Sequence, residues 1–121
     1  MTSKTDRNET FTVADDHLVR SVIPASAPGR GSRGKPYEHR CPRHAFENVV
    51  QVADEFGDRG FTLEELAEWA AVPSTQAAVT LAFLKERGCV VTRYRRSYPA
   101  DECLFEDAMT EYWALAEKGD G

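Results

Sequence analysis

The stretch from Phe61 to Val90 constrains the fold of this chain most strongly, because helix start and stop signals follow one another closely within it. Thr62 and Glu65 have the spacing of a capping box, which predicts the first turn of a helix. Pro73 lies in a short connection after that helix and precedes a second helical periodicity. Gly88 then indicates where the second helix ends. We therefore expect two short helices joined by a tight turn.

Two longer amphipathic helices are expected on either side of this stretch. Before it, apolar residues follow the i, i+3, i+4 rhythm from Phe46 to Phe56, and Gly57 indicates the stop. After it, residues 103–117 separate into an apolar half and a charged half when placed at ~100° per residue. The apolar arc spans roughly 180°, wider than the ~100° that a surface helix generally buries, which favours a dimer.

A small β-hairpin is expected before the last helix. Val90 to Tyr94 is rich in β-branched and aromatic residues, which predicts a strand. Arg95 to Pro99 is polar and basic, which predicts a loop. The hairpin is then either short or completed by a return strand near residues 100–104. The expected fold class is mainly α with a small β-hairpin and a C-terminal amphipathic helix.

Composition divides the chain into a basic arm and an acidic body. Residues 29–44 carry five basic groups and one acidic group, whereas residues 45–121 carry seven basic and fifteen acidic groups. The segment Ala25–Pro36 consists mainly of Gly, Pro, Ser and Arg and has little to bury. We therefore expect residues 1–41 to be a disordered or flexible basic N-terminal tail and residues 42–118 to form one domain.

Residues 61–90, FTLEELAEWAAVPSTQAAVTLAFLKERGCV, resemble the core of MarR- or ArsR-type transcription regulators. The shared features are a Thr-capped short helix, a small apolar turn, a helix that begins with Ser and Thr, and a Leu-x-x-x-Gly ending that leads into β structure. The resemblance implies a winged helix-turn-helix fold. It also implies a dimeric DNA-binding protein that regulates transcription.

The resemblance further implies where DNA would be contacted. In that family the third helix enters the major groove, and the hairpin that follows it lies along the DNA backbone. Phosphate contacts supply most of the affinity in such complexes, whereas base contacts supply the specificity. The implied nucleic-acid-binding residues, at the start of the third helix and in the hairpin, are Ser74, Thr75, Gln76, Arg93, Tyr94, Arg95 and Arg96.

The third helix also carries an apolar flank that DNA reading does not explain. Val79 and Phe83 lie one turn apart, where the family usually has polar or cationic side chains. Apolar side chains can recognise little in a major groove beyond the methyl group of thymine. Exposed apolar patches usually mark protein interfaces instead. The alternative hypothesis is a protein–protein interaction or assembly module without DNA binding, whose interface residues are Val79, Phe83 and Trp113. The position of the stripe in the structure separates the two hypotheses.

Signals for chemistry elsewhere in the chain are incomplete. Gly29–Pro36 approaches a phosphate-binding loop, but Pro36 stands where the loop needs a hydroxyl residue for Mg²⁺. Cys41 and His44 form one close ligand pair, whereas a structural zinc site normally has two. The same pair, acting as nucleophile and base, would need an orienting third group and a cleft. We therefore expect no catalytic residues, no metal and no cofactor.

Cysteine usage and hydropathy favour a cytoplasmic protein. The three cysteines have irregular spacing, which fits reduced thiols better than a disulfide framework. No apolar run approaches the ~20 residues needed to span a bilayer. The N-terminus also lacks the apolar stretch of a signal peptide. We expect a cytoplasmic protein without a membrane partner.

Overall fold

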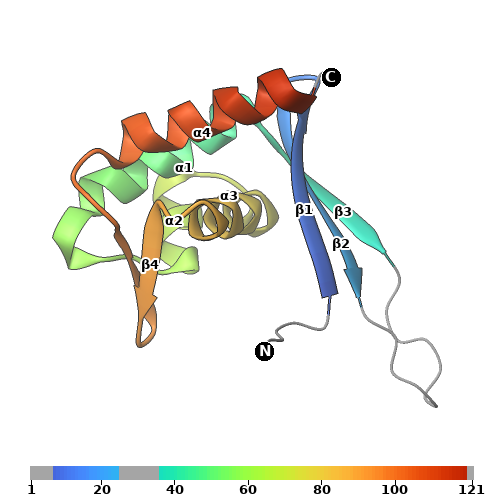
Figure 1. Cartoon of the computed structure of the whole chain (residues 1–121). Coiled ribbons are helices and arrows are strands. Elements are labelled where there is room, and N and C mark those ends of the chain that lie inside the picture. Colours follow the sequence, from blue (N-terminus) through green and yellow to red (C-terminus); the bar gives the residue numbers. More distant parts are fainter. Residues whose placement is uncertain (1–6, 25–35, 120–121) are drawn as a thin grey trace, which may run out of the picture.

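A computed structural model describes residues 7–24 and 36–119, which form a mixed α/β fold of four α-helices and two small antiparallel sheets (Figure 1). The helices are α1 (Arg43–Phe56), α2 (Leu63–Ala70), α3 (Ser74–Glu86) and α4 (Leu104–Gly119), with a single 3-10 turn, η1 (Gly57–Arg59), after α1. The strands are β1 (Arg7–Ala14), β2 (His17–Pro24), β3 (Tyr37–Pro42), β4 (Val90–Arg93) and β5 (Arg96–Pro99).

The expected helices are confirmed, and local sequence signals explain their ends. At the start of α2, the Thr62 hydroxyl accepts from the Glu65 N–H at 3.1 Å, and the Glu65 carboxylate accepts from the Thr62 N–H at 3.0 Å. This is the capping box that the sequence predicted. The turn into α3 is tight because Ala71 adopts a left-handed conformation with φ 58°.

The β4–β5 hairpin is confirmed, but its boundaries differ from the prediction. The basic segment expected to be a loop supplies the return strand, since β5 pairs with β4 from Val90–Pro99 to Arg93–Arg96. Phe61 adds a further antiparallel bridge, because its N–H and C=O both bond to Ser97. The hairpin is thereby joined to the start of α2. The three β-branched residues of β4 gave the strand its signal, whereas pairing of the Arg-rich half is a tertiary outcome.

The prediction of a flexible tail over residues 1–41 is wrong for the residues of that range that the structure describes. β1, β2 and β3 form an antiparallel sheet in that order, here called the N-terminal sheet. The sheet forms because one of its faces is apolar and packs on α3, which burial stabilises. Phe11, Leu18 and Cys41 of the sheet belong to the core that α3 shares, and Val19 and Val22 of β2 are also buried. Residues 1–6 and most of the predicted linker, residues 25–35, lie outside the described residues.

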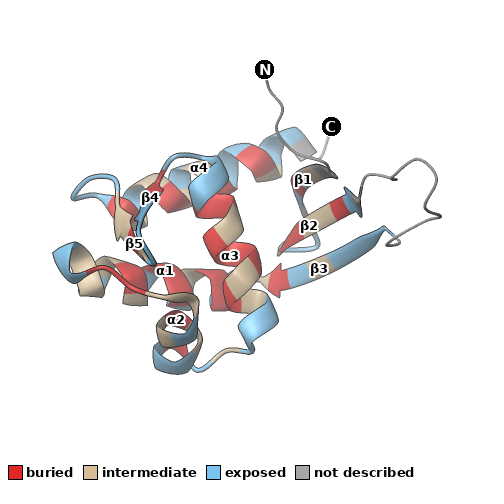
Figure 2. Ribbon diagram, turned by 90° about the horizontal axis from the view of Figure 1, so that it is seen from below, coloured by how far each residue is buried: buried red, intermediate tan, exposed pale blue. Residues whose placement is uncertain are grey.

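Helix α3 occupies the centre of the core. It packs against α1 and α2 on one side and against β2 and β3 on another, and Figure 2 shows buried residues along its middle and exposed ones at its ends. Six of its residues are buried: Ala77, Val79, Thr80, Leu81, Phe83 and Leu84. Helix α4 lies along α1 and contacts β1. No helix among residues 7–24 and 36–119 has both the length and the apolar character needed to cross a membrane.

Candidate functional site

The apolar flank of α3 is closed inside the molecule. Val79 and Phe83 have no exposed surface. The Phe83 ring meets Phe11 of β1 at 5.4 Å and Phe46 of α1 at 5.8 Å between centroids, both edge-on. The prediction that Val79 and Phe83 form an exposed interface is therefore wrong. Phe83 is covered within the chain by the N-terminal sheet, through Phe11, and by α1, through Phe46.

Helix α3 leaves one narrow face open to solvent. Ser74 and Thr75 are exposed at its start, and Gln76 is half-buried. Further along, the open face consists of small half-buried side chains, Ala78 and Ala82, and it ends in charged residues. Only the first turn of α3 therefore retains polar groups of the kind that the family resemblance assigns to base recognition.

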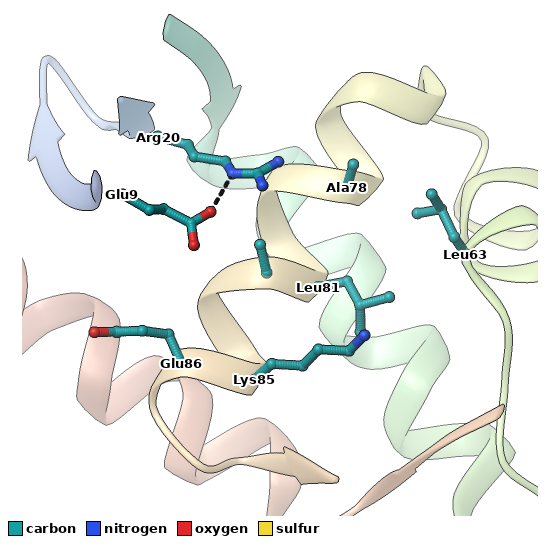
Figure 3. Close-up of a pocket in the computed structure, with 8 residues that line it drawn as sticks. Glu9, Arg20, Leu63, Ala78, Leu81, Lys85 and Glu86 are labelled. Atoms are coloured by element: carbon teal, nitrogen blue, oxygen red, sulfur yellow. Dashed lines mark hydrogen bonds and ion pairs between the residues drawn. The ribbon is translucent and has the colours of Figure 1, made fainter. Parts of the chain in front are cut away.

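This open face is the floor of an elongated recess. One hollow, of about 480 Å³, lies between α3, α2 and the N-terminal sheet, and Figure 3 shows its lining residues. A second hollow, also of about 480 Å³, extends from there to the β4–β5 hairpin. The two share Leu63, Leu81 and Lys85, so they form one continuous surface, here called the recess.

Two β-structures flank the recess. Figure 1 shows α3 end-on, with the N-terminal sheet on one side and the β4–β5 hairpin on the other, and both extend beyond it in the same direction. Figure 2, seen from that side, again places α3 between the two. The helix that the family resemblance assigns to the major groove thus lies between two flanking β-structures.

The predicted hairpin residues divide between structural and exposed positions. Arg96 donates to the Glu65 carboxylate at 2.8 Å and to the Gly60 carbonyl at 2.9 Å, so it ties the hairpin to α2. Arg93 lies over the Tyr98 ring, with its guanidinium carbon 5.4 Å from the centroid. Tyr94 is 99% exposed at the tip. Arg95 beside it is exposed and has no ion pair within the described part of the chain.

The backbone at the hairpin tip is unfavourable for the residue that occupies it. Tyr94 has φ 58°, a left-handed conformation that bulky side chains rarely adopt. Within the described residues its ring makes no aromatic pair, and the residue is 99% exposed. An outlier of this kind on a projecting loop is a common mark of a functional position.

The recess carries charges of both signs. Lys85 lies on the floor, and Glu64 lies beside Leu63 at the start of α2. Arg20 and Glu9 form an ion pair on the wall made by the N-terminal sheet (Figure 3). Glu86 lies at the far end and pairs with Arg87. The surface is therefore mixed rather than uniformly basic, which sets it apart from a typical DNA-binding face.

Trp113, the third predicted interface residue, lies apart from the recess on α4. Its ring is 47% exposed and packs edge-on against Tyr112 at 5.2 Å. The Arg43 guanidinium lies over the ring at 5.5 Å and also bonds to Asp16 at 2.8 Å. The hydrogen bond from Arg43 holds the pKa of the Asp16 carboxyl below its usual value. Trp113 thus belongs to a network that anchors the β1–β2 turn.

The three cysteines lie in surroundings that disfavour the thiolate. Burial raises the pKa of Cys41, whose Sγ lies 3.4 Å from the Thr80 hydroxyl. Burial and nearby carboxylates raise the pKa of Cys89 to about 11. Cys103 is exposed, but the neighbouring Glu106 raises its pKa. Thiolates are the nucleophilic and metal-binding form, and the described residues contain no group of three side chains suited to hold a metal.

Sequence reasoning missed the recess and the sheet that forms one of its walls. The available signal for the sheet was Asp15-Asp16 between two runs rich in β-branched residues, a pattern typical of a two-residue hairpin turn. Both aspartates have positive φ, at 52° and 61°. No comparable signal marks Leu63 and Leu81 as recess residues, because their spacing is the same as that of core leucines.

Comparison of the chain with protein-family models, curated proteins and solved structures finds no match to any of them.

Proposed function

We propose that residues 43–99 are a winged-helix unit that serves as a protein-interaction module rather than as a reader of DNA bases. The order of three helices followed by a hairpin supports the fold assignment. So does the bridge between Phe61 and Ser97, which gives the hairpin a third short strand between α1 and α2. Winged helices serve both DNA and protein partners, so the function rests on the surface and not on the fold.

The observation that carries the proposal is the enclosure of α3. A recognition helix needs a protruding face with side chains that can hydrogen-bond to base edges. Here the flank with Phe83 lies under the N-terminal sheet, and the open face offers Ala78 and Ala82, with the largely buried Leu81 between them. An apolar floor between projecting walls suits a protein side chain or segment better than a base pair.

A second candidate function is contact with the DNA backbone through the hairpin. Arg93 and Arg95 are exposed on either side of Tyr94, and Lys85 lies nearby on the recess floor. Three cations in one place would attract phosphate, and such binding weakens steeply as salt rises. Glu64 in the same hollow opposes that attraction.

One experiment separates the two candidates. Tyr94 is replaced by the photoreactive residue p-benzoylphenylalanine, and the full-length protein is irradiated in cells. We expect crosslinked adducts whose partner is digested by protease but not by nuclease, which identifies the partner as a protein. The matched control carries the same residue in place of Thr110, which is exposed on α4, and it should not give the same adducts.

A binding titration provides the complementary test. A fluorescent mixed-sequence DNA duplex at low salt should show no saturable binding. The alternative, contact with the DNA backbone, would be established by saturable binding whose affinity falls with salt. The slope of log affinity against log salt concentration should then become shallower by about one for each of Arg93 and Arg95 that is replaced by alanine. Nuclease-sensitive adducts in the first experiment would lead to the same conclusion.

A further inference from the structure

The projecting hairpin tip and the recess lie on the same face of the molecule. Tyr94 and Arg95 line the second hollow together with Leu63 and Leu81, so a projection and a depression adjoin one another. Figure 1 shows the hairpin extending past α3 beside the space that the N-terminal sheet bounds on the other side. A surface that carries both shapes side by side can be complementary to itself through a two-fold rotation.

The tip has the properties of a group that lacks its contact. Tyr94 presents a large amphipathic ring that is 99% exposed, and it does so from a left-handed backbone conformation. Glycine or asparagine would adopt that conformation at lower cost. Aromatic side chains that fill a partner's pocket are the commonest strong contributors to protein interfaces.

The charges beside the tip and beside the floor are opposite. Arg95 follows Tyr94 at the tip, and Glu64 follows Leu63 at the edge of the recess. Neither forms an ion pair within residues 7–24 and 36–119. If a tip enters the recess of a second copy, each Arg95 meets a Glu64, and the two-fold rotation repeats the pair.

We propose that two copies of this chain associate by exchanging hairpin tips. Tyr94 of each copy seats on Leu63 and Leu81 of the other, and Arg95 faces Glu64 across the interface. The inference rests on the proposed protein-interaction function and names its partner as a second copy. A DNA backbone is a poorer occupant, because Glu64, which has no ion pair among the described residues, would repel phosphate beside Leu63.

A charge-exchange experiment tests the proposal on the full chain by sedimentation velocity over micromolar to submillimolar concentrations. The wild-type protein should dimerise. Arg95→Glu and Glu64→Arg should each raise the dimer dissociation constant at least about tenfold, because each places two like-charged pairs in the interface. An equimolar mixture of the two variants should form a heterodimer, since both of its pairs are again opposite in charge.

Two further variants keep the test specific. Tyr94→Ser should also raise the dissociation constant at least about tenfold, because it removes the inserted ring. Trp113→Ser alters an exposed aromatic on α4, away from the recess, and should leave the dissociation constant unchanged. Circular dichroism should confirm that all variants remain folded, as expected for exposed positions.

The outcomes are distinct. A wild-type protein that stays monomeric at every concentration overturns the proposed exchange of hairpin tips. The proposal is also overturned if Trp113→Ser dissociates the dimer while the Tyr94 and Arg95 variants remain dimeric. A mixture of the two charge variants that stays monomeric overturns the pairing of Arg95 with Glu64. In each case, protease-sensitive adducts of the photoreactive residue at position 94 would still support a protein-interaction function with another partner, whereas nuclease-sensitive adducts would remove both.

Discussion

Two β-turns in the described part of the chain, β1–β2 and β4–β5, have the same backbone feature but different surroundings. The β1–β2 turn and the β4–β5 turn both place residues other than glycine at positive φ, with Asp15 and Asp16 in the first and Tyr94 in the second. In the first turn the Asp16 carboxylate accepts from Arg43 at 2.8 Å and from the Tyr112 hydroxyl at 3.2 Å. In the second turn the side chain points into solvent.

The two turns differ in the contacts that offset the steric cost of their positive φ angles. The first is stabilised by contacts within the chain, which fix the N-terminal sheet against α1 and α4. In the second turn the hairpin is held by Arg96 and Ser97, while the Tyr94 side chain itself is 99% exposed and takes no part in these contacts. Strain that the fold itself offsets indicates a structural role, whereas exposed and unoffset strain indicates a functional one.

The largest expected effect comes from the side chain that joins the N-terminal sheet to the helices. Phe83→Ala should lower the free energy of unfolding by about 3–5 kcal/mol, because the ring is fully buried between Phe11 and Phe46. Urea denaturation measures the change. Trp113→Ala, at a half-exposed ring, should cost clearly less; equal losses for the two variants would contradict the burial of the α3 flank.

A smaller loss is expected when the first turn loses one of its anchors. Tyr112→Phe removes the hydroxyl that donates to Asp16 and should lower the free energy of unfolding by about 1 kcal/mol. The matched variant Tyr94→Phe removes an exposed hydroxyl and should change nothing. If Tyr94→Phe proved the more destabilising of the two, the distinction between the anchored and the free turn would be lost.

The free turn should respond in the opposite direction. Tyr94→Gly should raise the free energy of unfolding of the dilute monomer by about 0.5–1 kcal/mol, because glycine adopts positive φ without the steric cost. Tyr94→Ala retains that cost and serves as the control in the same urea series. A destabilising Tyr94→Gly would mean that the ring already makes stabilising contacts within its own chain.

The smallest expected effect is a dependence on pH. The hydrogen bond from Arg43 lowers the pKa of Asp16 in the folded protein, so this carboxylate contributes stability above its unfolded pKa of about 3.9. That contribution is lost as pH falls through the lower, folded pKa. Thermal melts below about pH 4 should therefore decline more steeply for the wild type than for Asp16→Asn. Parallel declines would show that the anchor contributes nothing measurable.

Much of the helical part could be predicted because its signals are local. The capping box at Thr62, the stop at Gly57 and the two-sided pattern of the last helix each lie within a few residues of the feature they specify. The apolar stripe of Val79 and Phe83 was also recognised as a surface that needs a cover. The sequence did not reveal the cover, because it comes from strands far earlier in the chain: Cys41 precedes Thr80 by 39 residues, and Phe11 lies still further from Phe83.

The same division applies to the candidate site. Tyr94 and Arg95 could be selected from the sequence, since cations and aromatics alternate along the hairpin. Arg96 has the same chemistry, yet it bonds to Glu65 and Gly60. Only the fold distinguishes an arginine that holds the hairpin in place from one that is free to meet a partner.

The sequence by itself determined which segments become helices, where they start and stop, and that the third helix carries an apolar flank at Val79 and Phe83. The tertiary structure decided which element covers that surface, and consequently which face of α3 stays open. The physical reason is that caps and turns are set by hydrogen bonds between near neighbours, whereas apolar burial is non-directional. Any apolar face of suitable shape can cover another, so the choice among distant segments is made only when the whole chain packs.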